Sequence, residues 1–199
     1  MHKIDIHIIV SSTNSPLHRL SKLLSISISR SCPKTEHHMK ESWNSNHDLQ
    51  NIIIPPHHEK ISFDVVQLFP SMRLRLIVIG IGKRWHLIEN HTLLSKDEFL
   101  EAVNLIFKNT HSQFDGEFYK QEDGAPRGLP LSPIVANLVM EDCIENCLRV
   151  LENTSNFEPI ILRIFADDGL AVIPRDQVRN FIRTFNENNE NLDFTIEKG

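Results

Sequence analysis

The stretch IILRIFADDGLAVI, residues 160–173, carries the pattern that decides the expected fold. Two largely apolar runs flank Asp167, Asp168 and Gly169, which predicts two strands of a β-hairpin with carboxylates at its tip. Strands this apolar are buried, and two adjacent carboxylates at a tight turn are costly to place there without a cation. A solvent-exposed Asp-Gly turn has the same local pattern. A functional interpretation of this pair of acids therefore needs support from a second feature elsewhere in the chain.

A further carboxylate interrupts an apolar strand earlier in the chain. Asp64 lies within KISFDVV, residues 60–66, and is the only charged residue between Ile61 and Phe69. A buried Asp satisfied by its neighbours, or one at a strand end, would look the same. Together with the acidic pair at 167–168 it offers carboxylates on different strands of one sheet. Hard divalent cations prefer oxygen ligands, and phosphoryl transfer uses two such ions, so the arrangement is typical of a metal-dependent site.

The remaining patterns predict helices and strands in an order that fits one sheet. The local start and turn signals are Ser15 with Pro16, the capping box Ser95–Glu98, and the hairpin turn Asp115–Gly116 within 114–119. Helices are expected at 16–29, 40–52, 72–91, 95–110, 133–152 and 175–188, and further strands at 4–10 and 191–197. This order predicts an α+β fold, an antiparallel sheet backed by helices on one face.

Length and charge are compatible with one large domain. At 199 residues, 40% of them hydrophobic, the chain can build a real core. Its net charge of −5 is unlike that of an obvious nucleic-acid binder. The charge is uneven, because residues 1–35 carry roughly +4 and the stretch Arg73–Arg84 has four cations and no acid. A basic channel beside an acidic centre would explain this unevenness, and so would solvated helix faces.

Cysteine, histidine and hydropathy exclude several other classes of protein. Three cysteines without framework spacing argue against a disulfide-stapled secreted domain, and Cys143 and Cys147 are interpreted as core thiols. The doublets His37–His38 and His57–His58 lack a matching set of metal ligands, so both are predicted in loops. No signal peptide and no membrane-length apolar run are visible, so the expected location is the nucleus or cytoplasm, without a membrane partner.

One loop is rich in glycine and proline. GAPRGLPLSP, residues 124–133, cannot form a regular element, but its restricted backbone can approach a flat ligand closely before it enters a helix near Ser132. Turns of this composition are common, so the loop is weak support by itself.

Four motifs of this sequence resemble those of reverse transcriptases, especially those of Penelope-like retroelements. SFDVVQLF (62–69) resembles the first palm motif, GAPRGLPLSPIVANLVME (124–141) the second, FADD (165–168) the metal-binding third and NENLDFTIEKG (189–199) the fourth. IVSSTNSPLHRLSKLL (9–24) is similar to the fingers segment that precedes the palm. The resemblance implies a polymerase palm over residues 58–199 after a partial fingers segment over residues 1–57. It also implies that the thumb and the endonuclease domain are missing, so processive synthesis is not expected.

The resemblance further implies RNA-directed DNA synthesis by two-metal catalysis. Asp64 and Asp167 would hold two Mg²⁺ ions (Mn²⁺ is also compatible), helped by the backbone carbonyl of Val65, with Asp168 near the primer end. The primer 3′-OH would attack the α-phosphate of a dNTP and release pyrophosphate. The implied partners are an RNA or DNA template, a DNA primer and the dNTP.

An aromatic residue and the glycine-proline loop are the implied nucleotide contacts. Phe69 falls five residues after Asp64, where reverse transcriptases place an aromatic gate against a ribose 2′-OH. Without the motif around it, Phe69 would be read as an ordinary core aromatic. The other implied nucleotide contacts are Gln67, Pro126, Arg127 and Gly128.

Several residues depart from the family pattern. Members usually have Met in place of Arg127 and Ser in place of Leu129, and His7 stands where an Arg usually grips the triphosphate. Lys198 lies where the fourth motif can supply a cation to the leaving group. Two alternatives therefore stay open. One is a decayed or captured retroelement remnant that folds and binds nucleic acid without activity. The other is an RNA-dependent RNA polymerase, which shares the palm acids but is disfavoured by Phe69.

Overall fold

The computed structural model describes residues 15–32, 53–189 and 191–197, and it divides the chain into two compact units. Unit 1 comprises residues 1–32 and 69–136, and unit 2 comprises residues 33–68 and 137–199. Each unit is thus assembled from two separate segments of the chain. The strand expected at 4–10 and the helix expected at 40–52 lie outside the described residues. The division at residue 57 into fingers and palm rests on the resemblance and stays a prediction.

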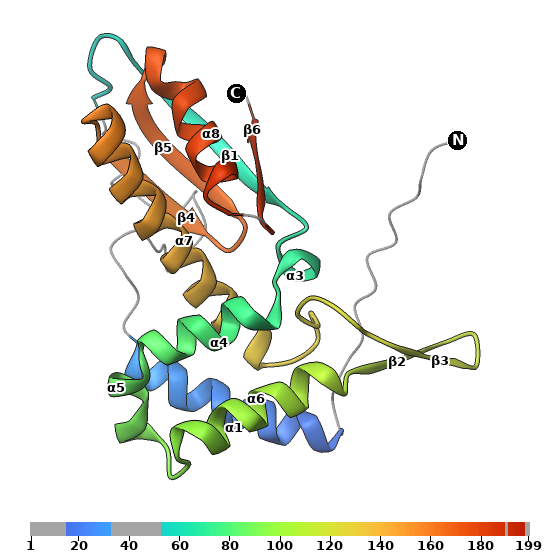
Figure 1. Cartoon of the computed structure of the whole chain (residues 1–199). Coiled ribbons are helices and arrows are strands. Elements are labelled where there is room, and N and C mark those ends of the chain that lie inside the picture. The colour runs from blue at the N-terminus through green and yellow to red at the C-terminus, as the bar shows by residue number, and fades with distance from the viewer. Residues whose placement is uncertain (1–14, 33–52, 190, 198–199) are drawn as a thin grey trace. The chain divides into compact units, whose positions relative to one another are not determined.

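Unit 2 contains a four-stranded antiparallel sheet. Its strands are β1 (His58–Val66), β4 (Ile161–Phe165), β5 (Asp168–Pro174) and β6 (Asp193–Glu197). They are arranged in the order β4-β5-β1-β6, so β1 is central although it comes first in the sequence (Figure 1). The mixed α+β class and the antiparallel sheet predicted from the sequence are therefore confirmed.

Helices cover one face of this sheet. Helix α8 (Val178–Glu187) and the part of α7 (Leu131–Ser155) that belongs to unit 2 lie on the same side of the strands (Figure 1). The ring of Phe63 on β1 lies 5.7 Å from that of Phe181 and 5.8 Å from that of Phe185, both on α8. These rings are fully buried, and aromatic side chains of this size dominate the stability of a core. The odd-numbered residues of β1 therefore face the helices, and the even-numbered residues face away.

Unit 1 is mostly helical. Its elements are α1 (Pro16–Ser31), α3 (Leu68–Ser71, with Leu68 in unit 2), α4 (Leu74–Lys83), α5 (Trp85–Ile88), the 3-10 turn η2 (Glu89–His91), α6 (Lys96–Lys108), and the hairpin β2 (His111–Phe114) with β3 (Glu117–Lys120). Helix α1 packs against α5 and α6, so an N-terminal helix joins helices that follow β1 in the sequence. Trp85 and Phe99 meet edge to face in this core, with ring centroids 5.5 Å apart.

The local start signals predicted from the sequence are confirmed. The Ser15 hydroxyl accepts a hydrogen bond from the His18 backbone N–H at 3.1 Å, which caps α1. Both halves of the capping box between Ser95 and Glu98 are formed at the start of α6. The hairpin turns on Asp115–Gly116, where both residues have positive φ, as its tight turn requires.

Two predicted helices differ from the structure. The single helix expected over 72–91 is wrong, because the chain forms α4, α5 and η2 instead. The break lies at Arg84, whose φ of −101° and ψ of 10° leave the helical region and whose N–H bonds the carbonyl three residues earlier. The helix expected over 175–188 begins as the 3-10 turn η3 (Arg175–Gln177) and becomes α-helical only at Val178.

The cysteine prediction is confirmed and the histidine prediction is partly wrong. Cys143 and Cys147 are free, buried thiols on α7, and a hydrogen bond with Cys147 together with burial raises the pKa of Cys143. His57 lies in a turn, but His58 is the first residue of β1 because it pairs with Pro174 of β5. The doublet at 37–38 lies outside the described residues. None of the helices in the described part of the chain combines the length and apolar character needed to cross a membrane.

Candidate active site

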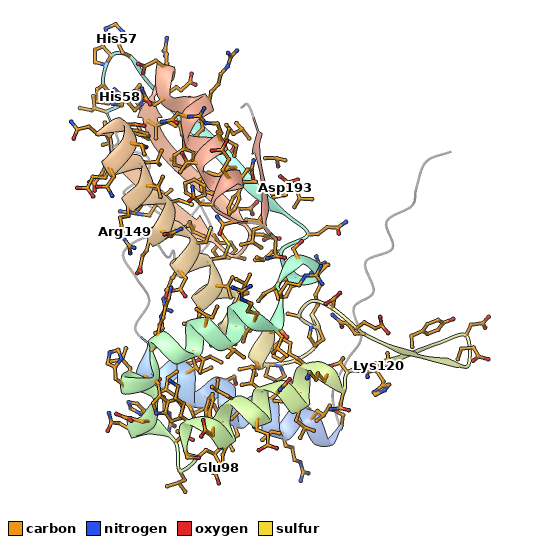
Figure 2. All side chains as sticks on the ribbon, in the orientation of Figure 1. His57, His58, Glu98, Lys120, Arg149 and Asp193 are labelled. Atoms are coloured by element: carbon orange, nitrogen blue, oxygen red, sulfur yellow. The ribbon has the colours of Figure 1, made fainter. Side chains whose placement is uncertain are left out.

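Two carboxylates lie opposite each other on β1 and β5, the two central strands of the sheet in unit 2. Asp64 on β1 and Asp168 on β5 are directly paired in the antiparallel register. Residues paired in this way project from the same face, with Cβ atoms about 4.5–5.5 Å apart. Because Asp64 has an even number, this is the face away from α8. His58 and Asp193 mark the two ends of β1 in Figure 2, and Asp64 lies near the Asp193 end, where Asp193 pairs with Val66.

A glycine next to this acidic pair lets the two strands adopt their register. Gly169 pairs with Phe63, one position along from the pair of acids. A Cβ atom at Gly169 would lie 2.0 Å from Cζ of the Phe63 ring and 2.1 Å from Cε2. The ring therefore occupies the space that any other residue at 169 would need. The same ring is anchored on α8, so the aromatic core of unit 2 controls where β5 lies beside β1.

The tip of the acidic hairpin is one step earlier than predicted. Asp168 is the first residue of β5, so the turn consists of Ala166 and Asp167, and the predicted tip at Asp167–Asp168–Gly169 is corrected. Ala166 has a φ of 57°, a left-handed conformation that costs an L-residue about 1–2 kcal/mol. The backbone N–H of Val65 donates to the Asp167 carbonyl at 3.1 Å. The strained turn is thus tied to β1 one residue after Asp64.

The donor set at this hairpin suits a hard divalent cation. Asp64, Asp167 and Asp168 offer only oxygen ligands, which Mg²⁺ prefers. In the described residues no three His, Cys, Asp or Glu side chains lie close enough together to hold a metal ion. Mg²⁺ is ordinarily held by one or two protein carboxylates plus water and substrate phosphates, so a paired set of acids still fits it. The metal roles of Asp64, Asp167 and Val65 stay predictions.

In unit 1, the predicted gate residue lies beneath an arginine. Phe69 lies in the short helix α3, and its ring is partly exposed rather than buried in a core. The guanidinium carbon of Arg127 lies 5.5 Å from the centroid of this ring, which is within the range of a cation–π interaction. The structure therefore brings together two of the predicted nucleotide contacts that are 58 positions apart in the sequence.

The glycine-proline loop is clamped onto the segment around Phe69. The backbone N–H of Ala125 donates to the Phe69 carbonyl at 2.7 Å. Gly124 has a φ of 79°, and a Cβ atom there would come within 2.7 Å of Phe69 and Pro70 backbone atoms. Only glycine tolerates both that conformation and that approach. The sequence predicts that this loop can approach a flat ligand closely, and the close approach in the structure is to the backbone of Phe69 and Pro70.

Two side-chain contacts hold the ends of this loop. At one end, the hydrogen bond from Arg73 holds the pKa of Asp123 below its ordinary value, and the same contact raises the pKa of Arg73. At the other end, the Ser132 hydroxyl donates to the carbonyl of Pro126 at 2.5 Å. Leu129, between these contacts, is almost fully buried. Leu129, which stands where the resemblance leads us to expect Ser, is therefore a packing residue.

The other predicted site residues are placed as follows. Pro126 is buried, and Gly128 is partly exposed in the same loop. Gln67 is exposed immediately after β1, with a φ of 51° that turns the chain sharply there. His7 and Lys198 lie outside the described residues. The acids of the hairpin and Gln67 belong to unit 2, whereas Phe69 and the loop belong to unit 1.

Sequence reasoning missed three residues that shape these sites. The sequence pattern places Gly169 in a turn, whereas in the structure it is a strand residue that accommodates Phe63. A glycine in a strand interior is a recognised sign of a close approach, so that signal was present. The contact of Asp123 with Arg73 joins residues 50 positions apart, and no local pattern predicts it.

Comparison with known proteins finds similarity in structure only. No protein-family model and no curated protein match this sequence. A solved telomerase from Candida albicans, in complex with a fragment of telomeric RNA, is similar with a TM-score of 0.61 at 15% identity, over 92% of this chain and 35% of that chain. An apo telomerase from Candida tropicalis has a TM-score of 0.59 at 12% identity, over 93% and 37% of the two chains.

A second kind of polymerase is also similar. A solved structure described as RNA-dependent RNA polymerase, vp4 and dsRNA has a TM-score of 0.66 at 12% identity, over 95% of this chain and 19% of that chain. This chain therefore spans only about a third of the telomerases and about a fifth of the RNA polymerase. At these identities the likeness shows the fold, which is a nucleic-acid polymerase-like fold of helices and an antiparallel sheet.

Proposed function

We propose that this chain is part of an RNA-directed DNA polymerase, a reverse transcriptase of the Penelope-like kind. The observation that carries the proposal is the pairing of Asp64 with Asp168, with Asp167 in the adjoining turn, inside a polymerase-like fold. Acids on two strands of one sheet are what a phosphoryl-transfer site needs if cations are to neutralise the reacting phosphates. The four sequence motifs, in their order along the chain, support the finer assignment.

The residues have distinct roles in this proposal. Asp64 and Asp167, with the carbonyl of Val65, hold Mg²⁺, and Asp168 lies near the primer end. When bound, the metal ions lower the pKa of the primer hydroxyl and neutralise charge on the phosphates. Phe69 excludes the ribose 2′-OH, and the loop residues Pro126, Arg127 and Gly128 together with Gln67 bind the incoming nucleotide.

The proposed partners are an RNA or DNA template, a DNA primer and a dNTP. The similar telomerase structure contains telomeric RNA, and the similar RNA polymerase is described with dsRNA. In this chain, helix α1 contains no acidic residue and exposes Arg19, Lys22 and Arg30. Such an acid-free face offers favourable contacts to phosphate groups and supports a nucleic-acid partner. Lys198 is proposed to supply a cation to the leaving pyrophosphate.

The test is single-nucleotide primer extension by the 199-residue chain. Enzyme is in excess over an oligo(dT) primer on poly(rA), with Mg²⁺ and dTTP, and the readout is the primer lengthened by its first nucleotide, which needs no processivity. We expect Asp64→Asn and Asp167→Asn to abolish the addition and Asp168→Asn to reduce it. The matched control is Asp176→Asn, an exposed acid beyond the far end of β5 from Asp168, which should leave the rate unchanged.

The outcome separates the proposal from its alternatives. As a control, circular dichroism and thermal unfolding are used to check that each variant is folded. No addition by the wild-type chain would refute the polymerase activity and favour a folded remnant that only binds nucleic acid. Addition of UTP as readily as dTTP would favour an RNA-dependent RNA polymerase. Extension that survives Asp64→Asn would remove the role of the acidic pair.

A further inference from the structure

Arg127 and Phe69 form a pair that the backbone around them holds in place. The ring of Phe69 and the side chain of Arg127 are both partly exposed, and the guanidinium carbon lies 5.5 Å from the ring centroid. A long side chain on an unrestrained loop would lose this contact readily through its rotamer freedom. Whether the contact between Arg127 and Phe69 persists therefore depends on how firmly hydrogen bonds restrain the loop that carries Arg127.

The loop that carries Arg127 is restrained on both sides. Two residues before it, the N–H of Ala125 bonds to the carbonyl of Phe69 itself. Immediately before it, the carbonyl of the buried Pro126 accepts a hydrogen bond from the Ser132 hydroxyl. Gly124 lies against the backbone of Phe69 and Pro70, with no room for a side chain between them. The α-carbon of Arg127 is thus held near the ring by main-chain contacts.

We propose that Arg127 is a positioning residue that acts through Phe69 and sharpens the choice between deoxyribonucleotides and ribonucleotides. The inference rests on the proposed function, in which Phe69 excludes the 2′-OH. A gate works only while its ring stays in the blocking rotamer. A planar cation over one ring face disfavours rotation of the ring away from that position, because rotation would break the contact.

The magnitude follows from the strength of such contacts. A partly exposed cation–π interaction corresponds to roughly a two- to fivefold change in an equilibrium constant. Loss of the guanidinium should therefore lower the discrimination against a 2′-OH by about that factor. Replacement by Met keeps a long apolar side chain over the ring and removes only the charge and the planar group. Replacement by Lys keeps a cation without the planar face, so its effect should be intermediate.

The experiment compares dATP and ATP, which differ only in the 2′-OH. Dissociation constants are measured by calorimetry with Mg²⁺ for the wild type, Arg127→Met, Phe69→Ala and the double variant, and discrimination is the ratio of the ATP constant to the dATP constant. Arg127→Lys serves as the conservative variant. In parallel, 4-fluorophenylalanine at position 69 reports the ring environment by ¹⁹F NMR, which detects the contact without any activity.

We expect Arg127→Met to shift the ¹⁹F resonance and to lower the discrimination two- to fivefold. In the Phe69→Ala background the same change should have no further effect on the ratio of the ATP constant to the dATP constant, because Arg127 acts on this ratio through the ring. Unchanged discrimination in Arg127→Met, an equal loss with and without the Phe69 ring, or equal binding of dATP and ATP by the wild type would each overturn the inference. Absence of primer extension alongside the expected binding ratios would instead refute the polymerase activity and leave the pair's role standing.

Discussion

Replacing Gly169 by alanine should destabilise unit 2 by displacing the ring of Phe63. The new Cβ atom would lie 2.0, 2.1 and 2.5 Å from Cζ, Cε2 and Cε1 of that ring. Since ordinary van der Waals contact begins at 3.4 Å, the ring would have to move by about 1.4 Å. It has little room to do so, because it is buried against Phe181 and Phe185 at centroid distances of 5.7 and 5.8 Å.

The expected cost is about 3 kcal/mol, the upper end of the range for an overpacked core. For a chain of this size that corresponds to a fall of roughly 10 °C in melting temperature. The assay is thermal and urea unfolding followed by circular dichroism, with amide hydrogen exchange to locate the weakened strands. Exchange should accelerate in β1 and β5, and the distance between Asp64 and Asp168 should become less well defined, since their pairing adjoins that of Phe63 with Gly169.

Two further variants test whether a steric clash with the Phe63 ring causes the loss of stability. Gly82→Ala is the matched control, because a Cβ atom there meets nothing within 4 Å and the residue is helical, so the change should stabilise the protein by about 1 kcal/mol. Phe63→Leu removes the three ring atoms that the new methyl would strike, so Gly169→Ala should cost much less in that background. Wild-type stability for Gly169→Ala, or strictly additive losses in the double variant, would refute the steric argument.

Two other predictions follow from the turn and the loop. Ala166→Gly should stabilise the protein by about 0.5–1 kcal/mol by relieving the left-handed conformation at φ 57°, measured as a higher urea midpoint, and a lower midpoint would contradict the strain. Hydrogen bonding by Arg73 lowers the pKa of Asp123, so its contribution to stability is present above about pH 4 and is lost as the pH falls through the lowered value. Wild type and Asp123→Asn should therefore differ slightly in urea midpoint at pH 6 and converge at pH 2. A difference that grows on acidification would contradict a lowered pKa for Asp123.

Much of the fold was predictable because its signals are local. The caps at Ser15 and Ser95, the Asp115–Gly116 turn and the apolar strands around the acidic pair depend on residues within a few positions of one another. Helix continuity was less predictable, because Gly80 and Gly82 before the break at Arg84 weaken a helix without fixing the residue at which it ends. The exact tip of the acidic hairpin was also missed, since Ala166 is an unusual residue for a left-handed position.

For the candidate sites, the sequence by itself determined which residue types are present and in what order. Tertiary structure alone decided that Asp64 faces Asp168, that Gly169 makes room for Phe63 and that Arg127 covers Phe69. The physical reason is that strand register and side-chain stacking depend on contacts between residues far apart in the chain. Periodicity assigns a residue to a face of its own strand or helix, but it contains no information about which distant residue lies opposite.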